Sequence, residues 1–422
     1  MNIKKFIVKN LFSTFEHKIE FNNNVTLIMG ENGVGKTMTL KLIDAIFNRH
    51  YEVLLKTEFE SISIEFPARE KWTIIRKIEE KQNGKRRFFI EISSKLEKDS
   101  YQLDSDMLSQ RIPPYFEEIN DDRWLNRRTG VIYSRLYMMK RYNMDLPQGE
   151  PEWMQNQLNK NKVRLIETQR LHIYKYNEDE REHSVELAVD AYAKELSEAI
   201  QKEIAYAMVV SNQLDRTFPK RLIKFLRKDK INTKESILKD LKALEERRKE
   251  LSSIGLQTEN VSENASIKDF DESDKTMLAV MQLYVEDSQN KLKQYDDIYQ
   301  KVSILSDIIN SHFKRKVLTI DSTHGFLFKT KSMSGEEFTL PLSKLSSGEQ
   351  NELVLFYELL FKCGNNDLIM IDEPEISLHL EWLQTMVGDL KRIVGQNKSS
   401  LLIATHSPDL VGDNYDLVQN LE

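Results

Sequence analysis

Gly30-Glu31-Asn32-Gly33-Val34-Gly35-Lys36-Thr37 is the stretch that decides the fold of this 422-residue chain. Its spacing is G-x-x-x-x-G-K-T, in which the glycines allow successive backbone N–H groups to point at one anion. The apolar run Val25–Met29 before it predicts a buried strand, and apolar residues follow at helical spacing from Met38 to Phe47. A strand, a glycine-rich turn and a helix in this order are typical of a loop that binds phosphate groups.

The chemistry of this loop predicts what each part of it binds. A helix N-terminus contributes about half a positive charge where the phosphates would lie. Lys36 is expected to reach the β- and γ-phosphates of a nucleotide, and the Thr37 hydroxyl to be a Mg²⁺ ligand. The predicted phosphate-binding residues are Gly30, Glu31, Asn32, Gly33, Val34, Gly35, Lys36 and Thr37.

The composition excludes several classes of protein. With 61 Lys and Arg against 67 Asp and Glu, the formal net charge is −6, so no overall positive field attracts nucleic acid. A single cysteine, Cys363, excludes a disulfide framework and a zinc site built on several thiolates. The sequence has no run of about twenty apolar residues, and its N-terminus lacks the apolar segment of a signal peptide. We therefore expect a soluble, cytoplasmic protein.

Residues 1–180 have the pattern of strands arranged around the loop and its helix. Period-two alternation predicts strands at 3–8, 17–21, 61–66, 72–78 and 87–92, with a hairpin turn at 81–85. Residues 96–160 are polar and irregular, and no element is predicted there. The apolar run Val163–Thr168 predicts a further strand, which ends at Gln169-Arg170.

Residues 181–314 have the pattern of helices. An apolar stripe runs at helical spacing from Val185 to Met208, and Pro219 is expected to end that helical region and open another. A long helix is predicted around the apolar positions from Met281 to Ile309. At 1.5 Å per residue such a helix spans roughly 50 Å, which predicts a short antiparallel coiled-coil arm.

Strand patterns return after residue 315, so the elements expected at a nucleotide site lie near both ends of the chain. We expect an N-terminal lobe at 1–180, a helical arm at 181–314 and a C-terminal lobe at 315–422. The predicted fold class is α/β, with mixed and parallel sheets, flanking helices and a helical insertion between the two lobes.

Asp372-Glu373 is the second group of residues that carries chemistry. It follows the apolar run Leu368–Ile371, so both carboxylates are predicted at the C-terminal edge of a sheet, where open α/β sheets bind ligands. Asp372 fits the acid associated with Mg²⁺. Glu373 fits a base that polarises the attacking water, a role that contributes roughly 10²–10⁴-fold in rate. The alternative, a carboxylate pair that caps a helix, is disfavoured by the four apolar residues that lead into it.

Leu345-Ser346-Ser347-Gly348-Glu349-Gln350 begins another predicted helix. Ser347 and the Gly348 N–H would form a helix N-terminus that can accept a phosphate. The same residues could equally be a helix cap, with Glu349 in the first turn. The position of this stretch just upstream of the Asp372-Glu373 strand favours the phosphate-binding interpretation.

Taken together, Gly30–Thr37, Ser347–Gln350, Asp372-Glu373 and His406 resemble the ABC-type ATPase family in its soluble branch, which includes SMC, RecF and OLD-like proteins. The resemblance covers both ends of the chain. It implies an ABC-type P-loop ATPase head that uses ATP and Mg²⁺. It also implies a homodimer, or a larger homo-oligomer, in which Ser347, Gly348 and Glu349 of one chain close over the ATP held by the partner.

The same resemblance implies roles for two further residues. Gln169 would link Mg²⁺ and the attacking water to the helical region, and His406 would sense the γ-phosphate. From the residues alone, Gln169 could also be a solvated glutamine at a strand end. A lone histidine is usually structural, but His406 follows an apolar strand and a threonine.

Within that branch, Asp372–His379 and Ala404–Pro408 look like the prokaryotic ATPases related to RecF and to the OLD family, and so does Leu214–Pro219. Anti-phage systems such as Septu, with its PtuA subunit, and PARIS, with its AriA subunit, use ATPases of this type. OLD and Gabija ATPases continue into a Toprim nuclease domain, which this sequence lacks after His406. The analogy implies an ATPase that works with a separately encoded effector, such as an HNH or Toprim nuclease.

A basic run supports a different function. Its residues are Arg216, Lys220, Arg221, Lys224, Arg227 and Lys228. They could bind nucleic-acid phosphates, as in a RecF-like repair or recombination ATPase, although a solvated helix face is the simpler interpretation. A transporter subunit is disfavoured by the long helical region, and a stand-alone nuclease by the lack of a second carboxylate cluster.

Overall fold

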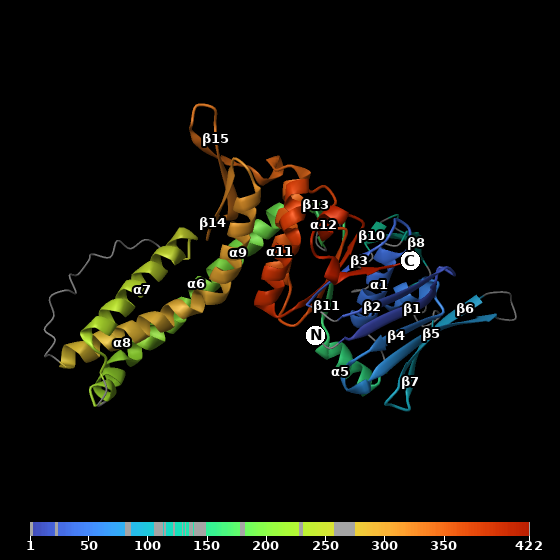
Figure 1. The fold of residues 1–422 in the computed structure, drawn as a ribbon, viewed down its shortest axis with the longest axis horizontal. Coiled ribbons are helices and arrows are strands. Elements are labelled where there is room, and N and C mark those ends of the chain that lie inside the picture. Colours follow the sequence, from blue (N-terminus) through green and yellow to red (C-terminus); the bar gives the residue numbers. More distant parts are fainter. Residues whose placement is uncertain are drawn as a thin grey trace. The chain divides into compact units, whose positions relative to one another are not determined.

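The structure is a computed structural model of the chain (Figure 1). It describes all residues except 1–2, 22–23, 81–85, 105–112, 114, 121–122, 129, 131, 135–137, 139–148, 178–181, 228–230, 257–274 and 422. The chain forms two compact units. The first consists of residues 1–186 and 358–422, and the second of residues 187–357.

The first unit contains a six-stranded antiparallel sheet in the order β2-β1-β4-β5-β6-β7. Its strands are β1 (Lys5–Leu11), β2 (Phe15–Glu20), β4 (Ser61–Glu65), β5 (Lys71–Glu80), β6 (Arg86–Ser94) and β7 (Ser100–Asp104). The five strands predicted between residues 3 and 92 are confirmed. The predicted hairpin turn at 81–85 lies outside the described residues.

A five-stranded sheet in the order β11-β17-β18-β3-β19 forms the second layer of this unit. Its strands are β11 (Val163–Ile166), β17 (Leu368–Asp372), β18 (Ser400–Thr405), β3 (Val25–Met29) and β19 (Val418–Asn420), and every neighbouring pair is parallel. Because the strands run the same way, their carboxyl ends share one edge. The register places Met29 opposite Thr405, Ala404 opposite Asp372 and Ile371 opposite Ile166.

Helix α1 (Lys36–Phe47) follows the glycine loop and shares one core with both sheets. It buries Leu40, Ile43 and Phe47 in a cluster that includes Phe6 of β1 and Met370 of β17. Burial of such side chains stabilises the layer by roughly 1.5–3 kcal/mol each. The glycine loop is therefore followed directly by a helix that packs against both sheets.

The remaining elements of the first unit are short, apart from one long helix. They are α2 (Tyr51–Lys56), β8 (Phe116–Asn120), β9 (Arg123–Asn126), β10 (Ile132–Ser134), α5 (Glu152–Lys160), β12 (His172–Asn177), β13 (Glu182–Leu187), α11 (Leu380–Asn397) and α12 (Pro408–Val411). A π-helical turn, Glu358–Lys362, also belongs to this unit. Residues 96–160, for which no element was predicted, thus contain β7, β8, β9, β10 and α5.

The second unit is mostly helical and also contains a small antiparallel sheet. Its helices are α6 (Ala188–Phe225), α7 (Lys234–Ser253), α8 (Lys275–Leu292), α9 (Asp296–His312) and α10 (Ser347–Tyr357). The sheet has the order β14-β15-β16, with β14 (Lys316–Asp321), β15 (Gly325–Lys331) and β16 (Glu337–Leu340). In Figure 1, α6, α7 and α8 extend side by side as a helical arm.

Two helix predictions for the arm were wrong. Helix α6 runs through Pro219 without a break, and it begins at Ala188, so that Val185, the first residue of the predicted stripe, lies in β13. Proline lacks the N–H that would bond to Asp215 O, so one helix hydrogen bond is lost there. Side chains around it bond to neighbouring carbonyls of the same helix, since Thr217 Oγ1 donates to Gln213 O at 2.9 Å and Arg221 Nη2 to Leu214 O at 2.7 Å.

The other wrong prediction concerns the long helix after residue 275. It is two helices, α8 and α9, joined by a 3₁₀ turn at Lys293–Tyr295. A 3₁₀ turn changes the direction in which successive side chains point while leaving the apolar spacing nearly helical. The sequence pattern therefore did not reveal the interruption.

The predicted α/β fold class, with parallel and mixed sheets and a helical insertion, is confirmed. The three predicted segments stay a prediction. The compact units have a boundary at 357/358 where a segment boundary at 314/315 was expected, because β14 packs on α9 and β15 packs on α6. No helix among the described residues is both long and apolar enough to span a bilayer.

A substitution at Gly325 tests how closely the small sheet packs on α6. It has φ +75°, and a Cβ there would overlap the Ala193 carbonyl oxygen. Gly335 has φ +86°, and nothing lies within 4 Å of its Cβ position. We expect Gly325→Ala to lower the free energy of unfolding by about 3 kcal/mol or more, through backbone strain and overpacking together. Gly335→Ala should cost only the strain, about 1–2 kcal/mol.

Urea unfolding of both variants measures this difference. Equal losses for Gly325→Ala and Gly335→Ala would contradict the close approach of β15 to α6.

Candidate functional site

The glycine loop has the backbone geometry that the sequence predicts. Gly35 has φ +90° and is the N-cap of α1, a conformation that L side chains rarely adopt. Gly30 approaches the chain after β19 so closely that a Cβ would lie 2.8 Å from Leu421 O. These two positions explain why the loop needs glycine at both ends.

Lys36 is directed into its own loop. Its Nζ donates to Gly30 O at 2.7 Å and to Glu31 O at 2.9 Å, and the residue is only 5% exposed. The ammonium group is thus held among backbone groups of the loop, while Glu31, Asn32 and Gly33 are exposed. All eight predicted loop residues belong to this one turn.

Thr37 and Asp372 meet although 335 residues separate them in sequence. Thr37 Oγ1 donates to the Asp372 carboxylate, at 2.9 Å from Oδ2 and 3.1 Å from Oδ1. Burial raises the pKa of Asp372, and the hydrogen bonds from Thr37 and Thr168 oppose this shift. A hydroxyl and a carboxylate side by side are hard oxygen donors of the kind that Mg²⁺ prefers.

Glu373 follows at the end of β17 in a left-handed backbone conformation, with φ 45°. Its N–H donates to Ala404 O at 2.9 Å, so β18 holds the turn. Its carboxylate is about one quarter exposed and lies 3.8 Å from Nδ1 of His406. The predicted base and the predicted phosphate sensor therefore lie next to each other.

His406 begins the loop after β18, and a residue absent from the predictions holds it there. Glu375 Oε1 lies 3.1 Å from His406 Nδ1 and accepts a hydrogen bond from the His406 N–H at 2.9 Å. The same oxygen accepts the Thr405 hydroxyl at 2.6 Å.

The segment after β11 brings two more polar groups to this edge. Gln169 is exposed, one residue beyond Thr168, whose hydroxyl donates to Asp372 Oδ2 at 3.3 Å. Arg170 is buried, and its Nη2 donates to Pro374 O at 3.4 Å. The predicted role of Gln169 stays a prediction.

Sequence analysis missed Thr168, Arg170 and Glu375. The signal that could have found them is their position, because each lies within four residues of the end of a predicted parallel strand. In a parallel sheet those positions converge on one edge.

Ser347–Gln350 starts α10 in the second unit, and Glu349 takes part in a capping box. Glu349 Oε2 accepts from the Ser346 N–H at 2.7 Å, and the Glu349 N–H donates to Ser346 Oγ at 3.3 Å. Lys316 Nζ lies 2.7 Å from the same carboxylate. The cap interpretation therefore explains Glu349, while Ser347 is exposed and Gly348 buried. The ATP-binding role of all three stays a prediction.

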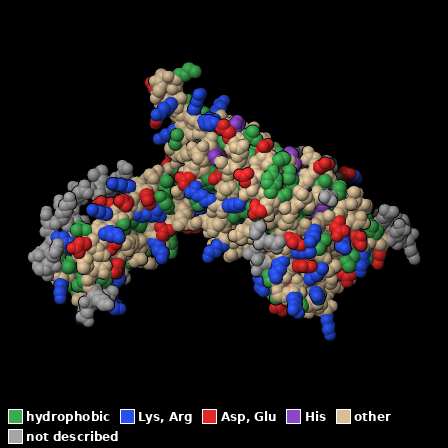
Figure 2. Space-filling model, viewed as in Figure 1, with side chains coloured by type: hydrophobic (Ala, Val, Ile, Leu, Met, Phe, Trp, Pro, Cys, Tyr) green, Lys and Arg blue, Asp and Glu red, His purple; other side chains and the backbone are tan. Residues whose placement is uncertain are grey.

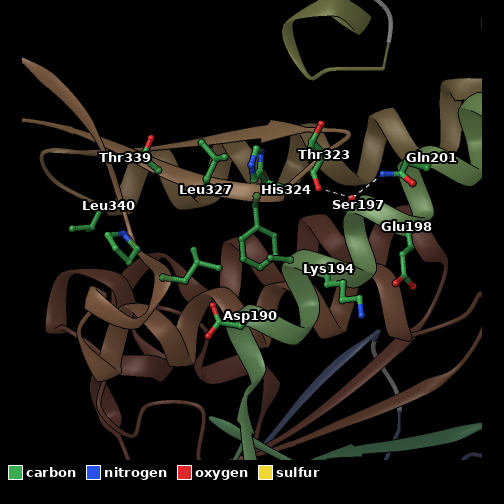
Figure 3. Close-up of a pocket in the computed structure, with 14 residues that line it drawn as sticks. Asp190, Lys194, Ser197, Glu198, Gln201, Thr323, His324, Leu327, Thr339 and Leu340 are labelled. Carbon is green, nitrogen blue, oxygen red and sulfur yellow. Dashed lines mark hydrogen bonds between the residues drawn. The ribbon is translucent and has the colours of Figure 1, made fainter.

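A groove of about 670 Å³ lies elsewhere in the second unit, between α6, β15 and the segment after β16 (Figure 3). Asp190, Lys194 and Glu198 line it along one face of α6, so charges of opposite sign alternate there. Ser197 Oγ donates to Thr323 O at 3.0 Å at one end. None of the predicted site residues lines this groove.

His17 is linked to the glycine loop through the Thr39 hydroxyl. It is fully buried, and its Nδ1 lies 2.8 Å from Thr39 Oγ1, which in turn donates to Gly35 O at 3.0 Å. Because the threonine hydroxyl donates to the carbonyl, it accepts from the ring, which assigns the proton to Nδ1. Burial lowers the pKa of His17, and the Val34 backbone partly offsets this.

Comparison with known proteins gives one clear family match. A family model described as "AAA ATPase domain" matches residues 1–411. No curated protein matches the chain. Among solved structures, the chain is similar to the Smc head domain with an extended coiled coil from Pyrococcus furiosus, a structure in which that domain is bound to the C-terminal domain of ScpA. The identity is 9% and the TM-score 0.36, over 97% of this chain and 91% of that one.

The buried His17 predicts a pH-dependent stability. In the unfolded chain the His17 pKa returns to its ordinary value near 6.5, so below that pH the unfolded state binds a proton that the folded state resists. The free energy of unfolding should therefore fall as pH drops from 6.5 toward the lowered pKa, and His17→Asn should flatten this part of the curve. Urea unfolding of both proteins at pH 7.5 and 5.5 measures the effect. Parallel curves would contradict it.

Proposed function

Because the chain belongs to the AAA ATPase domain family, we propose that it binds ATP at the glycine loop of the first unit and hydrolyses it there. The observation that carries the proposal is the hydrogen bond from Thr37 Oγ1 to Asp372, which joins the phosphate loop to the edge where Glu373 and His406 lie.

The residues fit the substrate and its metal. The glycine turn directs N–H groups and Lys36 at the phosphates, and Thr37 and Asp372 offer hard oxygen ligands. Mg²⁺ bound there would neutralise charge on the β- and γ-phosphates. Gln169 is exposed at the same edge, where it can reach a metal-bound water.

In this proposal, Lys36, Glu373 and His406 have separate roles in hydrolysis. Lys36 binds the terminal phosphates. Glu373 accepts a proton from the attacking water as the water oxygen bonds to the γ-phosphorus and the bond from that phosphorus to the β–γ bridging oxygen breaks, which releases ADP and phosphate. The quarter exposure of Glu373 leaves its carboxylate accessible to water. His406 donates a hydrogen bond to the terminal phosphate from the ring nitrogen that does not face Glu375.

We further propose that the ATPase is of the ABC type and works as a homodimer. The support is Ser347, which lies exposed at the first turn of α10 and so can contact a phosphate from a second chain. The capping box fixes that turn. In this arrangement Ser347 and Gly348 of each chain close over the ATP in the partner.

The effector part of the proposal rests on the sequence resemblance of Asp372–His379 and Ala404–Pro408 to RecF-related and OLD-family ATPases. The ATPase would hold or release a separately encoded nuclease, of HNH or Toprim type, in anti-phage defence. Co-purification of this chain with the protein encoded by the neighbouring reading frame, with and without ATP, tests the proposal. A nuclease that co-purifies and is released on addition of ATP supports the proposal, and a neighbour of unrelated function that does not bind would contradict it.

One observation favours the alternative, a RecF-like ATPase that binds DNA directly. Arg216, Lys220 and Lys224 are exposed on α6 at spacings of four residues, so they share one face, and Arg227 is exposed in the turn that follows the helix. Arg221 does not belong to this stripe, because it pairs with Asp287 at 2.7 Å. Lys228 lies outside the described residues. Figure 2 shows basic and acidic side chains mixed over the displayed face of the second unit.

The ATPase proposal predicts that one substitution removes ATP binding and that another slows hydrolysis but leaves binding intact. Lys36→Ala should abolish ATP binding, whereas Glu373→Gln should bind ATP and turn it over about 10²–10⁴ times more slowly. Glu60→Gln, an exposed carboxylate of the same unit, should match the unchanged protein. Calorimetry and phosphate release measure both quantities. ATP turnover by Glu373→Gln at the rate of the unchanged protein would contradict the role of that carboxylate.

The dimer proposal makes its own prediction. Glu373→Gln should elute as a dimer in ATP and Mg²⁺, because slow hydrolysis preserves the closed state. Adding Ser347→Arg should return it to a monomer that still binds ATP. A strict monomer of Glu373→Gln at every ATP concentration would refute the shared site.

The DNA alternative predicts that the basic stripe carries the binding. Changing Arg216, Lys220, Lys224 and Arg227 to Gln should weaken binding and lower the slope of log K against log salt by about one for each phosphate that is no longer neutralised. The matched control changes four other exposed lysines of α6 and α7 to Gln, namely Lys202, Lys239, Lys242 and Lys249. Fluorescence anisotropy across a salt series tests both. Equal losses in the two variants would exclude a specific stripe.

A further inference from the structure

Glu375 is a buried carboxylate at the edge of the site, and none of the roles above accounts for it. Its side chain is 6% exposed, and one oxygen, Oε1, accepts the Thr405 hydroxyl and the His406 N–H and lies 3.1 Å from His406 Nδ1. Thr405 Oγ1 also accepts from the Ser407 N–H at 3.0 Å. A single oxygen therefore fixes the backbone, the hydroxyl and the ring at the end of β18.

Two carboxylates lie close to the same ring nitrogen. His406 Nδ1 is 3.1 Å from Glu375 and 3.8 Å from Glu373. Glu375 is the closer of the two carboxylates, so the ring pairs with it and Glu373 is left available to water. Without Glu375, the nearest carboxylate to His406 would be Glu373 itself, and a bond between those two would occupy the base.

A buried guanidinium compensates the charge that Glu375 brings into the interior. Arg170 is 6% exposed, and Glu358, Glu375 and Asp372 attract its charge, while burial lowers the pKa of Arg170 to about 10. Among the described residues, Glu375 Oε2 and Arg170 Nε and Nη1 have no hydrogen-bond partner. Donors and acceptor of opposite charge are thus buried in the same region, which offsets the cost of burying either.

We propose that Glu375 is a positioning residue: its carboxylate pairs with His406 Nδ1, favours a proton on that nitrogen, reserves Nε2 for the terminal phosphate and keeps the ring away from Glu373. The catalytic consequence rests on the proposed ATP hydrolysis, whereas the state of the His406 ring does not. A carboxylate behind an imidazole fixes which ring nitrogen carries the proton and how the ring is oriented.

The first test is a double-mutant cycle in kcat. Glu375→Ala should lower kcat about 10–100-fold, the usual cost of losing such a partner, with little change in KM for ATP. If Glu375 acts through His406, then Glu375→Ala added to His406→Ala should cause no further loss. Losses that multiply in the double variant would overturn the proposal.

The second test needs no catalysis and separates this proposal from the proposed function. With labelled histidine, the imidazole nitrogen shifts of His406, assigned by its loss in His406→Ala, should report the Nδ1–H form in the unchanged protein. Glu375→Ala should shift the ring toward the Nε2–H form. If the unchanged protein fails to hydrolyse ATP, the proposed function is wrong, and this measurement alone decides the role of Glu375. Unchanged His406 shifts would refute it.

Glu150→Ala is the matched control for general destabilisation. Glu150 is equally buried, with a side chain 1% exposed, but it pairs with Arg49 at 3.1 Å. This variant should lower the melting temperature without altering the His406 shifts. If Glu375→Ala does not fold, Glu375→Gln decides both tests. The amide keeps the size and one acceptor oxygen but loses the charge, so kcat should fall less than His406→Ala lowers it, and a loss that multiplies with His406→Ala overturns the proposal.

Discussion

The hydrogen bond between the Thr37 hydroxyl and the Asp372 carboxylate is the contact on which the rest of the site depends. It joins the first residues of α1 to the end of β17, and so it fixes the distance between the phosphate loop and the carboxylate edge. The contact exists because β17 and β3 are both parallel neighbours of β18, which brings their carboxyl ends together. Glu373, His406 and Thr168 then take their positions from the same three strands and from β11.

The apolar sheet also explains why the site concentrates charge. β17 and β18 are buried along their whole length, so the first residues able to carry charge are those at and just beyond their ends. Ionised groups at such a boundary are partly desolvated, and each needs a partner. Asp372 has two hydroxyls, Glu375 has Thr405 and His406, and Arg170 lies among three carboxylates. The polar contacts at this edge thus serve the fold and the chemistry together.

Most of the fold could be predicted, and so could the residues that the structure brings to the loop and to the edge of the parallel sheet, because the decisive signals are local; their roles stay predictions. The glycine loop and Asp372-Glu373 each adjoin an apolar strand that the pattern reveals by itself. The predictions that were wrong or missing concern side-chain contacts that the sequence pattern does not show. Pro219 lies inside a helix in which Thr217 and Arg221 side chains bond to backbone carbonyls of the preceding turn, and spacing does not show these contacts. The contacts of Glu375 and Arg170 form only when β11, β17 and β18 lie next to one another, so the sequence does not reveal them. For Glu349 the local pattern allowed both a cap and a phosphate ligand, and Lys316, 33 residues away, completes the cap.

The place of β3 in its sheet has a consequence for synthesis of the chain on the ribosome. β3 lies between β18 and β19, so both of its partners are encoded more than 370 residues downstream. While translation proceeds, the nascent glycine loop lacks its parallel sheet, although the antiparallel sheet of residues 5–104 and helix α6 can already form from nearby residues. The edge at which Thr37 meets Asp372 therefore cannot assemble until β17 and β18 have left the exit tunnel.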